Sequence, residues 1–100
     1  SISGRGKALE DAFRAARPKT PHWYLVGLGV KPDLQGRGIG AALLRSGLER
    51  CDREGAPAYL ECLGNLIPYY EGYGFEVRGQ IGLPPETASQ FGMMRTPRGR

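Results

Sequence analysis

WYLVGLGVKPDLQGRGIGAALL, residues 23–44, joins an apolar run, a polar loop and the start of an amphipathic pattern. The run over residues 23–30 is apolar on both faces, which is typical of a strand that is covered on both sides of a sheet. The loop carries Gly36, Gly38 and Gly40, and leucines at helical spacing follow it. A strand, a glycine-rich loop and a helix in this order indicate an α/β fold.

The helical pattern after the loop continues to Glu54. Its apolar stripe consists of Ile39, Leu43, Leu44, Leu48 and Cys51. Gly55 and Pro57 end the helix, and residues 58–63 form the next strand. Because a strand, a helix and a second strand of this length form a crossover connection, we expect residues 23–30 and 58–63 to run parallel.

The rest of the chain predicts a small number of further elements. A short helix is expected over residues 67–73, followed by strands over 75–81 and 90–95 that pair antiparallel because they are joined locally. At the start, apolar residues at helical spacing predict a helix over residues 3–17, which Pro18 ends. We divide the chain into this helix with its linker, residues 1–21, and a functional part, residues 22–100.

Length and composition narrow the class of protein. One hundred residues indicate one small domain, and 40% hydrophobic with 24% charged residues is typical of a globular chain. No apolar run is long enough to span a membrane, so we expect no membrane partner. The net charge of +4 is carried by the two ends, residues 1–21 and 95–100. We therefore expect solvated basic ends and no nucleic-acid partner, which would need a basic folded surface.

The cysteines and the histidine leave little material for a metal. Cys51 and Cys62 lie inside apolar patterns, so we expect buried thiols in a reducing cytoplasm and no disulfide. His22 is the single histidine in the sequence. We expect no metal site.

The glycine loop predicts an anion site, because backbone N–H groups at the start of a helix bind phosphates. A P-loop is excluded, since Ala41 and Ala42 follow Gly40 where that motif has Lys and Ser or Thr. A dinucleotide fold stays an alternative: Gly36, Gly38 and Ala41 fit its motif, and Glu61 lies about 20 residues further on. However, a dinucleotide loop follows its strand almost directly, and here five residues separate Val30 from Gly36.

Two motifs resemble the GNAT superfamily of N-acetyltransferases. QGRGIG, residues 35–40, matches that superfamily's acetyl-CoA loop, and YYEGYGF, residues 69–75, is similar to its closing motif. The resemblance covers about residues 22–95. It implies a mixed α/β sheet with flanking helices, acetyl-CoA as co-substrate, and direct attack of a primary amine, on a small molecule or a peptide, through a tetrahedral intermediate.

The resemblance also implies which residues bind the co-substrate. The pyrophosphate would be bound by the loop and the first turn of the helix, namely Gln35, Gly36, Arg37, Gly38, Ile39, Gly40 and Ala41. The pantetheine arm would pair with Leu28 and Val30, with Gly29 leaving room for its approach. Many relatives have an asparagine two residues before the proline of the next region. Leu66 stands there in this chain, which leaves Asn65 as the candidate ligand.

The same resemblance assigns the catalytic groups. Tyr70 would protonate the departing thiolate, because a phenol and a thiol have similar pKa values. Tyr69 is about 100° away on a helix, so only one of the two tyrosines faces the sulfur. The strand before the loop lacks the glutamate that often acts as general base, and Glu61 and His22 are the remaining candidates, with Glu61 better placed.

The chain departs from the family in length. The family has three strands and two helices before the strand that starts here at Trp23, and this chain has one helix. We therefore expect the C-terminal half of a GNAT domain, lacking the N-terminal strands. The apolar row of residues 23–26 would lie at an open sheet edge, which predicts a homodimer or an additional N-terminal segment. The alternative function is a non-catalytic CoA- or dinucleotide-binding module.

Overall fold

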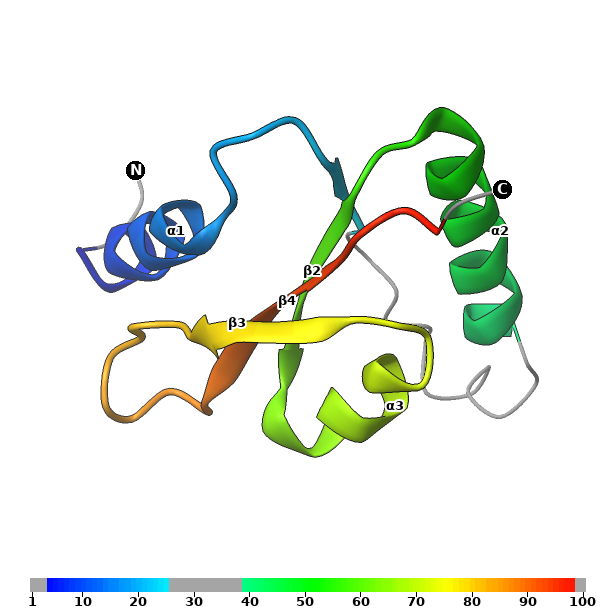
Figure 1. Ribbon diagram of the computed structural model, residues 1–100. Helices are drawn as coiled ribbons and strands as arrows, with labels where there is room; N and C mark the ends of the chain where they lie inside the picture. Colours follow the sequence, from blue (N-terminus) through cyan, green and yellow to red (C-terminus); the bar gives the residue numbers. More distant parts are fainter. Residues whose placement is uncertain (1–3, 26–38, 99–100) are drawn as a thin grey trace.

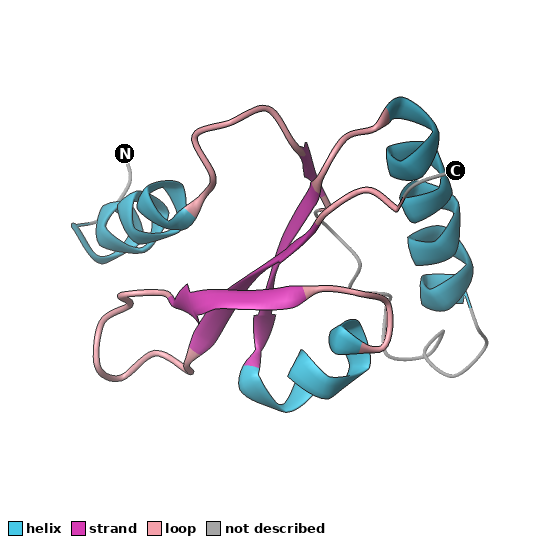
Figure 2. Ribbon diagram, viewed as in Figure 1, coloured by secondary structure: helices cyan, strands magenta, loops and turns pink. Residues whose placement is uncertain are grey.

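The computed structural model describes residues 4–25 and 39–98 and confirms the mixed α/β fold (Figures 1 and 2). Its elements, in chain order, are α1 (Gly4–Ala16), β1 (Trp23–Tyr24), α2 (Ile39–Glu54), β2 (Ala58–Leu63), η2 (Gly64–Leu66), α3 (Ile67–Glu71), β3 (Glu76–Gln80) and β4 (Gln90–Arg95). The predicted bounds of α1, β2, β4 and of the helix end at Glu54 agree closely with these. The predicted short helix is divided between the 3₁₀ turn η2 and α3.

The four strands form one sheet in the order β1-β2-β4-β3. β1 pairs parallel with β2, as the crossover pattern predicts, and the register aligns Tyr24 with Tyr59. β4 pairs antiparallel with β2 and with β3, and it aligns Gly92 with Glu61. The last strand in the sequence is therefore an inner strand, and β1 lies at an edge.

The core lies between the sheet and α2. Successive side chains of a strand point to opposite faces, and alternate residues of β2 and β4 pack on α2. The buried cluster consists of Leu44, Leu48, Cys51, Ala58, Leu60, Cys62, Phe75 and Met93. Both cysteines are buried, as expected. Ile67 and Tyr70 of α3 pack against the same cluster. α1 lies at the other end of the molecule from α2 (Figure 1).

Among the stripe residues whose burial the structure describes, Leu43 is not buried. Leu44, Leu48 and Cys51 lie in the core, whereas the Leu43 side chain is 57% exposed. Leu43 is about 100° from Leu44 around the helix, which is far enough to turn it away from the described strands. The stripe that contacts the sheet is therefore narrower than the sequence pattern predicts.

The expectation of solvated basic ends is wrong for Arg95. The Arg95 side chain is 5% exposed and forms an ion pair with Asp52 of α2 in which Nη1 lies 2.8 Å from Oδ1. Arg95 Nη2 donates to the second carboxylate oxygen of Asp52 at 3.1 Å, and Nε donates to the Tyr73 carbonyl at 2.9 Å. The guanidinium therefore joins β4, α2 and the turn after α3.

The turn after α3 contains a glycine with a backbone conformation that other residues rarely adopt. Gly74 has φ of 96°, in the left-handed region. Its N–H donates to the Glu71 carbonyl, and the Phe75 N–H donates to the Tyr70 carbonyl. The chain can therefore reverse from α3 into β3 within a few residues.

Only the start of the predicted strand over residues 23–30 can be compared with the structure. Trp23 and Tyr24 form β1, and the Leu25 N–H donates to the Tyr59 carbonyl. Residues 26–30 lie outside the described part of the chain.

Candidate active site

Glu61 lies at the centre of a polar cluster on the face of the sheet opposite α2. Its neighbours in the strand, Leu60 and Cys62, point into the core, so Glu61 points to the other face. The Tyr24 hydroxyl donates a hydrogen bond to Glu61 Oε1, and the Tyr59 hydroxyl donates to Oε2 at 3.3 Å. Each carboxylate oxygen therefore has its own phenol donor.

Burial keeps both phenols protonated. It raises the pKa of the Tyr24 hydroxyl, to which the hydrogen bond to Glu61 adds. Burial also raises the pKa of Tyr59, followed by the charge of Glu61. A protonated phenol is the form that can donate to a carboxylate, so the raised pKa values of both tyrosines favour these hydrogen bonds.

Tyr59 occupies space that only a glycine leaves open. Its ring lies over Gly92 of β4, where a Cβ atom would lie 2.6 Å from the Tyr59 hydroxyl oxygen. The ring is fully buried, and the His22 ring contacts it edge to face with centroids 5.8 Å apart. The position of the Tyr59 hydroxyl beside Glu61 thus depends on the missing side chain of Gly92.

Arg17, just after α1, contacts the Tyr24 side chain of this cluster. Its guanidinium carbon lies 4.4 Å from the centroid of the Tyr24 ring, and Nη2 donates to the Tyr24 hydroxyl at 3.3 Å. Its Nε is buried and has no hydrogen-bond partner among the described residues. α1 is therefore connected to the cluster through Arg17.

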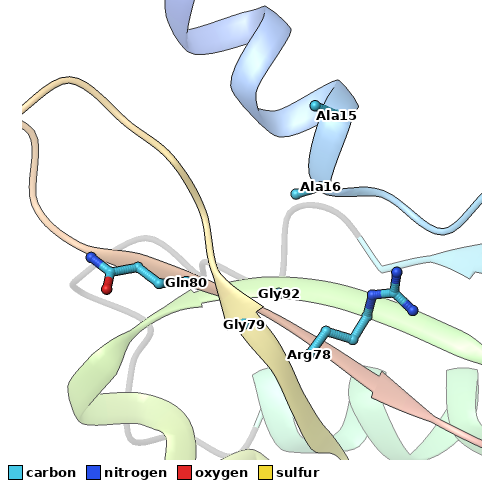
Figure 3. A pocket seen from close by; sticks show the side chains of 6 residues that line it. All are labelled: Ala15, Ala16, Arg78, Gly79, Gln80 and Gly92. Carbon is cyan, nitrogen blue, oxygen red and sulfur yellow. The ribbon is translucent and has the colours of Figure 1, made fainter.

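A hollow of about 250 Å³ lies beside this cluster, between the end of α1 and the β3–β4 hairpin (Figure 3). It is lined by Ala15, Ala16, Arg78, Gly79, Gln80 and Gly92. Gly92, one of the lining residues, is the register partner of Glu61, so the hollow lies beside the stretch of β2 that carries Glu61. Figure 3 shows the side chains of Arg78 and Gln80 extending to opposite sides of it.

Tyr70, the predicted acid, lies on the other face of the sheet. It packs against the core cluster that contains Cys62, and burial raises its pKa, with a smaller contribution from Cys62. No described residue forms a hydrogen bond with its hydroxyl. Tyr69 is 46% exposed, and its pKa is raised mainly by a hydrogen bond with Tyr73. The two neighbouring tyrosines therefore face different surroundings, as their helical spacing predicts.

The predicted co-substrate residues fall mostly outside the described part of the chain. These residues are Leu28, Gly29, Val30, Gln35, Gly36, Arg37 and Gly38. Ile39, Gly40 and Ala41 form the first turn of α2, which contains no acidic residue. Asn65 is exposed in η2, the turn between β2 and α3. A helix of 16 residues with no acidic side chain at its start is suited to an anion.

Sequence reasoning missed three members of the Glu61 cluster. Tyr59 could have been found, because it lies two residues before Glu61 on the same strand and therefore on the same face. Tyr24 and Arg17 carry no comparable signal. They are 37 and 44 residues away from Glu61 in the sequence. The pairing of β1 with β2 brings Tyr24 close to Glu61, and the position of the end of α1 brings Arg17 close to Tyr24.

Within residues 4–25 and 39–98, no group of three or more His, Cys, Asp or Glu side chains is placed to hold a metal ion. None of the described helices combines the length and the apolar character needed to cross a bilayer.

Comparisons with known proteins agree with the two motifs. Residues 4–75 match the model of the acetyltransferase (GNAT) family. A Schizosaccharomyces pombe protein described as an uncharacterized N-acetyltransferase is 43% identical over 63 residues, which cover 61% of this chain and 25% of that protein.

Solved structures of acetyltransferases share the fold. A histone acetyltransferase HPA2-related protein from Corynebacterium glutamicum superposes with a TM-score of 0.72 at 29% identity, over 84% of this chain and 46% of that one. The ribosomal-protein-S18-alanine N-acetyltransferase of Escherichia coli gives a TM-score of 0.60 at 24% identity, over 77% and 55%. The chain thus spans about half the length of these structures and a quarter of the S. pombe relative.

Proposed function

The chain belongs to the GNAT acetyltransferase family, and we propose that residues 22–100 are the acetyl-CoA-binding half of a domain that transfers the acetyl group to a primary amine on a small molecule or a peptide. Attack of the amine on the thioester forms a tetrahedral intermediate, from which the thiolate of CoA leaves. The chain must then supply an anion site for the pyrophosphate, a base for the amine and an acid for the thiolate.

The observation that carries the proposal is the placement of Glu61 and Tyr70 on the two faces of β2. Glu61 points to the face of the sheet opposite α2, and its neighbour Cys62 points into the core cluster on which Tyr70 packs. Because β4 pairs along the whole of β2 and β1, within the described residues, pairs only with its start, the thioester would lie at the β1 side of β2, with the carboxylate on one face of the sheet and the phenol on the other. The amine and the leaving sulfur occupy different positions around the tetrahedral carbon, so a separated base and acid suit this reaction.

Tyr70 is suited to the role of acid. Its raised pKa keeps the hydroxyl protonated at neutral pH, and no described residue takes up the proton in a hydrogen bond. A thiolate that forms nearby would be the first strong acceptor that this hydroxyl meets. Donation of the proton neutralises the thiolate and prevents the reverse reaction.

Glu61 is suited to the role of base. It is half-buried, and its two phenol donors fix the carboxylate in one orientation. The hollow lined by Gly92, the register partner of Glu61, lies beside this stretch of β2, and we propose it as the route of the incoming amine. His22 packs on Tyr59 and directs Nδ1 to the Thr20 carbonyl at 2.7 Å, so its ring is engaged away from Glu61.

The start of α2 supports the co-substrate assignment. Residues 35–38 directly precede this helix in the sequence, and its first turn provides N–H groups and no acidic side chain. Negatively charged phosphates are stabilised at such a helix start. We assign the pyrophosphate to residues 35–41, the pantetheine to residues 28–30 and a further contact to Asn65.

The test separates an enzyme from a binding module. The protein is mixed with acetyl-CoA and a panel of primary amines, and release of free thiol is followed together with the mass of the acetylated amine. Thermal stability is measured with CoA, acetyl-CoA, NAD and ATP. We expect thiol release and stabilisation by CoA and acetyl-CoA alone, and we expect Gly38→Glu to abolish that stabilisation by placing a carboxylate at the phosphate site.

Three other outcomes would contradict the proposal. Stabilisation by CoA without thiol release for any amine would support a non-catalytic module. Stabilisation by NAD alone would support the dinucleotide fold. An unchanged CoA effect in Gly38→Glu would place the pyrophosphate elsewhere.

A further inference from the structure

We propose that Tyr24 is a positioning residue of the acetyl transfer, which acts by holding the Glu61 carboxylate toward the amine. This inference rests on the proposed function, because it takes Glu61 as the base. Tyr24 reaches the site from β1, a strand next to β2 in the sheet but far away in the sequence.

The direction of the hydrogen bonds around Tyr24 follows from the donors available. A guanidinium can only donate, so the Tyr24 oxygen accepts from Arg17 Nη2. A hydroxyl has a single proton, and Glu61 Oε1 is its acceptor. Arg17 thus fixes the phenol so that its proton points at the carboxylate.

The ring of Tyr24 is held as firmly as its hydroxyl. The Arg17 guanidinium lies over one face of the ring, and Tyr59 lies 5.8 Å from it, centroid to centroid, at an angle of 45°. The neighbouring N–H of Leu25 is bonded to the carbonyl of Tyr59. This hydrogen bond fixes the pairing of β1 with β2 next to Tyr24. The backbones that carry Tyr24 and Glu61 are therefore held in one register.

Tyr24 and Tyr59 donate hydrogen bonds to different oxygens of the Glu61 carboxylate. Tyr24 donates to Oε1 and Tyr59 donates to Oε2, so rotation of the carboxylate would break both hydrogen bonds. An acid–base group misplaced by about 1 Å can lose on the order of 10² in rate. The phenols therefore set the orientation from which Glu61 accepts the proton of the amine.

The experiment compares Tyr24→Phe with the double variant Tyr24→Phe/Glu61→Gln. We expect Tyr24→Phe to lower kcat/KM for the amine by about 10- to 100-fold, the range of a hydrogen bond to a charged group, with little change in KM for acetyl-CoA. In the Glu61→Gln background, the same substitution is expected to cost almost nothing further. Losses that multiply, or a parallel rise in KM for acetyl-CoA, would overturn the inference.

Matched controls separate this role from general packing. Arg17→Met is expected to reduce kcat/KM for the amine in the same direction as Tyr24→Phe. Arg14→Met, which removes an exposed arginine paired with Glu10 on the same helix, is expected to leave it unchanged. Equal losses in the two arginine variants would assign the effect to α1 as a whole and would overturn the inference.

A second readout does not depend on turnover. The Tyr24 hydroxyl proton, assigned by NMR through its absence in Tyr24→Phe, is expected to shift strongly upfield in Glu61→Gln because it loses a charged acceptor. No shift would overturn the inference. If the wild-type chain acetylates no amine while the Tyr24 proton still moves upfield in Glu61→Gln, the proposed function would be contradicted and the hydrogen bond on which the inference rests would be supported.

Discussion

Asp52→Asn tests the contact that joins α2 to β4. Asp52 accepts two hydrogen bonds from the buried Arg95 guanidinium and one from the Arg98 backbone N–H at 2.9 Å. Removing one partner of a buried pair costs about 3 to 5 kcal/mol. Because the Asp52 side chain is 27% exposed and asparagine can still accept one bond, we expect about 2 to 3 kcal/mol. That corresponds to a fall in Tm of roughly 10 to 20 °C.

The pH dependence gives this prediction a second measurement. The hydrogen bonds from Arg95 hold the pKa of Asp52 at about 2, below its ordinary value of 3.8. A depressed pKa gives stability that is present above the unfolded value and is lost as pH falls through the folded one. The difference between wild type and Asp52→Asn is therefore expected to be full above about pH 4 and to shrink toward pH 2.

The assay is urea unfolding at fixed protein concentration, since the stability of a dimer depends on concentration. Glu54→Gln is the matched control, because Glu54 is on the same helix and is exposed beside Arg50. We expect a much smaller loss there. A loss in Asp52→Asn no larger than in the control, or a difference that is constant from pH 7 to pH 2, would refute the reasoning.

Three further outcomes are expected. Tyr70→Phe is expected to lower kcat by on the order of 10² to 10⁴ with little change in the acetyl-CoA Kd, and Tyr69→Phe to do much less; equal effects would indicate packing. Gly92→Ala is expected to lower the free energy of unfolding in urea by about 1 to 3 kcal/mol, because the added Cβ displaces the buried Tyr59 hydroxyl. Gly82→Ala is expected to lower it much less, because a Cβ at Gly82 would meet nothing within 4 Å. Light scattering of the 100-residue chain is expected to show a dimer or larger species, because β1 lies at a sheet edge, and a folded monomer that turns over acetyl-CoA would contradict this.

Local features of the fold could be predicted from the sequence. The spacing of Leu44, Leu48 and Cys51 predicts the buried face of α2, and β2 and β4 have the bounds that their apolar patterns indicate. The position of β4 between β2 and β3 could not be predicted, because it depends on pairing between segments that are distant in the sequence. The expectation that β3 and β4 pair antiparallel was correct. It did not include the pairing of β4 with β2.

Side chains that act across elements were harder to predict. Arg95 lies among basic residues near one end of the sequence, and only the approach of Asp52 from α2 explains its burial. Glu61 could be singled out as an isolated acid on a strand, whereas its partners Tyr24 and Arg17 depend on how β1 and α1 pack. The sequence pattern therefore identified candidate groups for the chemistry but not the residues that orient them.

The strand order has a consequence for how the chain is made. β2 and β3 form no direct ladder, because β4 lies between them. A ribosome that has released the chain only as far as β3 has therefore produced strands that cannot yet complete a sheet. Until residues 90–95 emerge, the inner edges of β2 and β3 are unpaired and open to wrong partners. The central hydrogen bonds of this fold thus form late in synthesis, and a nascent chain that stalls before β4 would be exposed to aggregation.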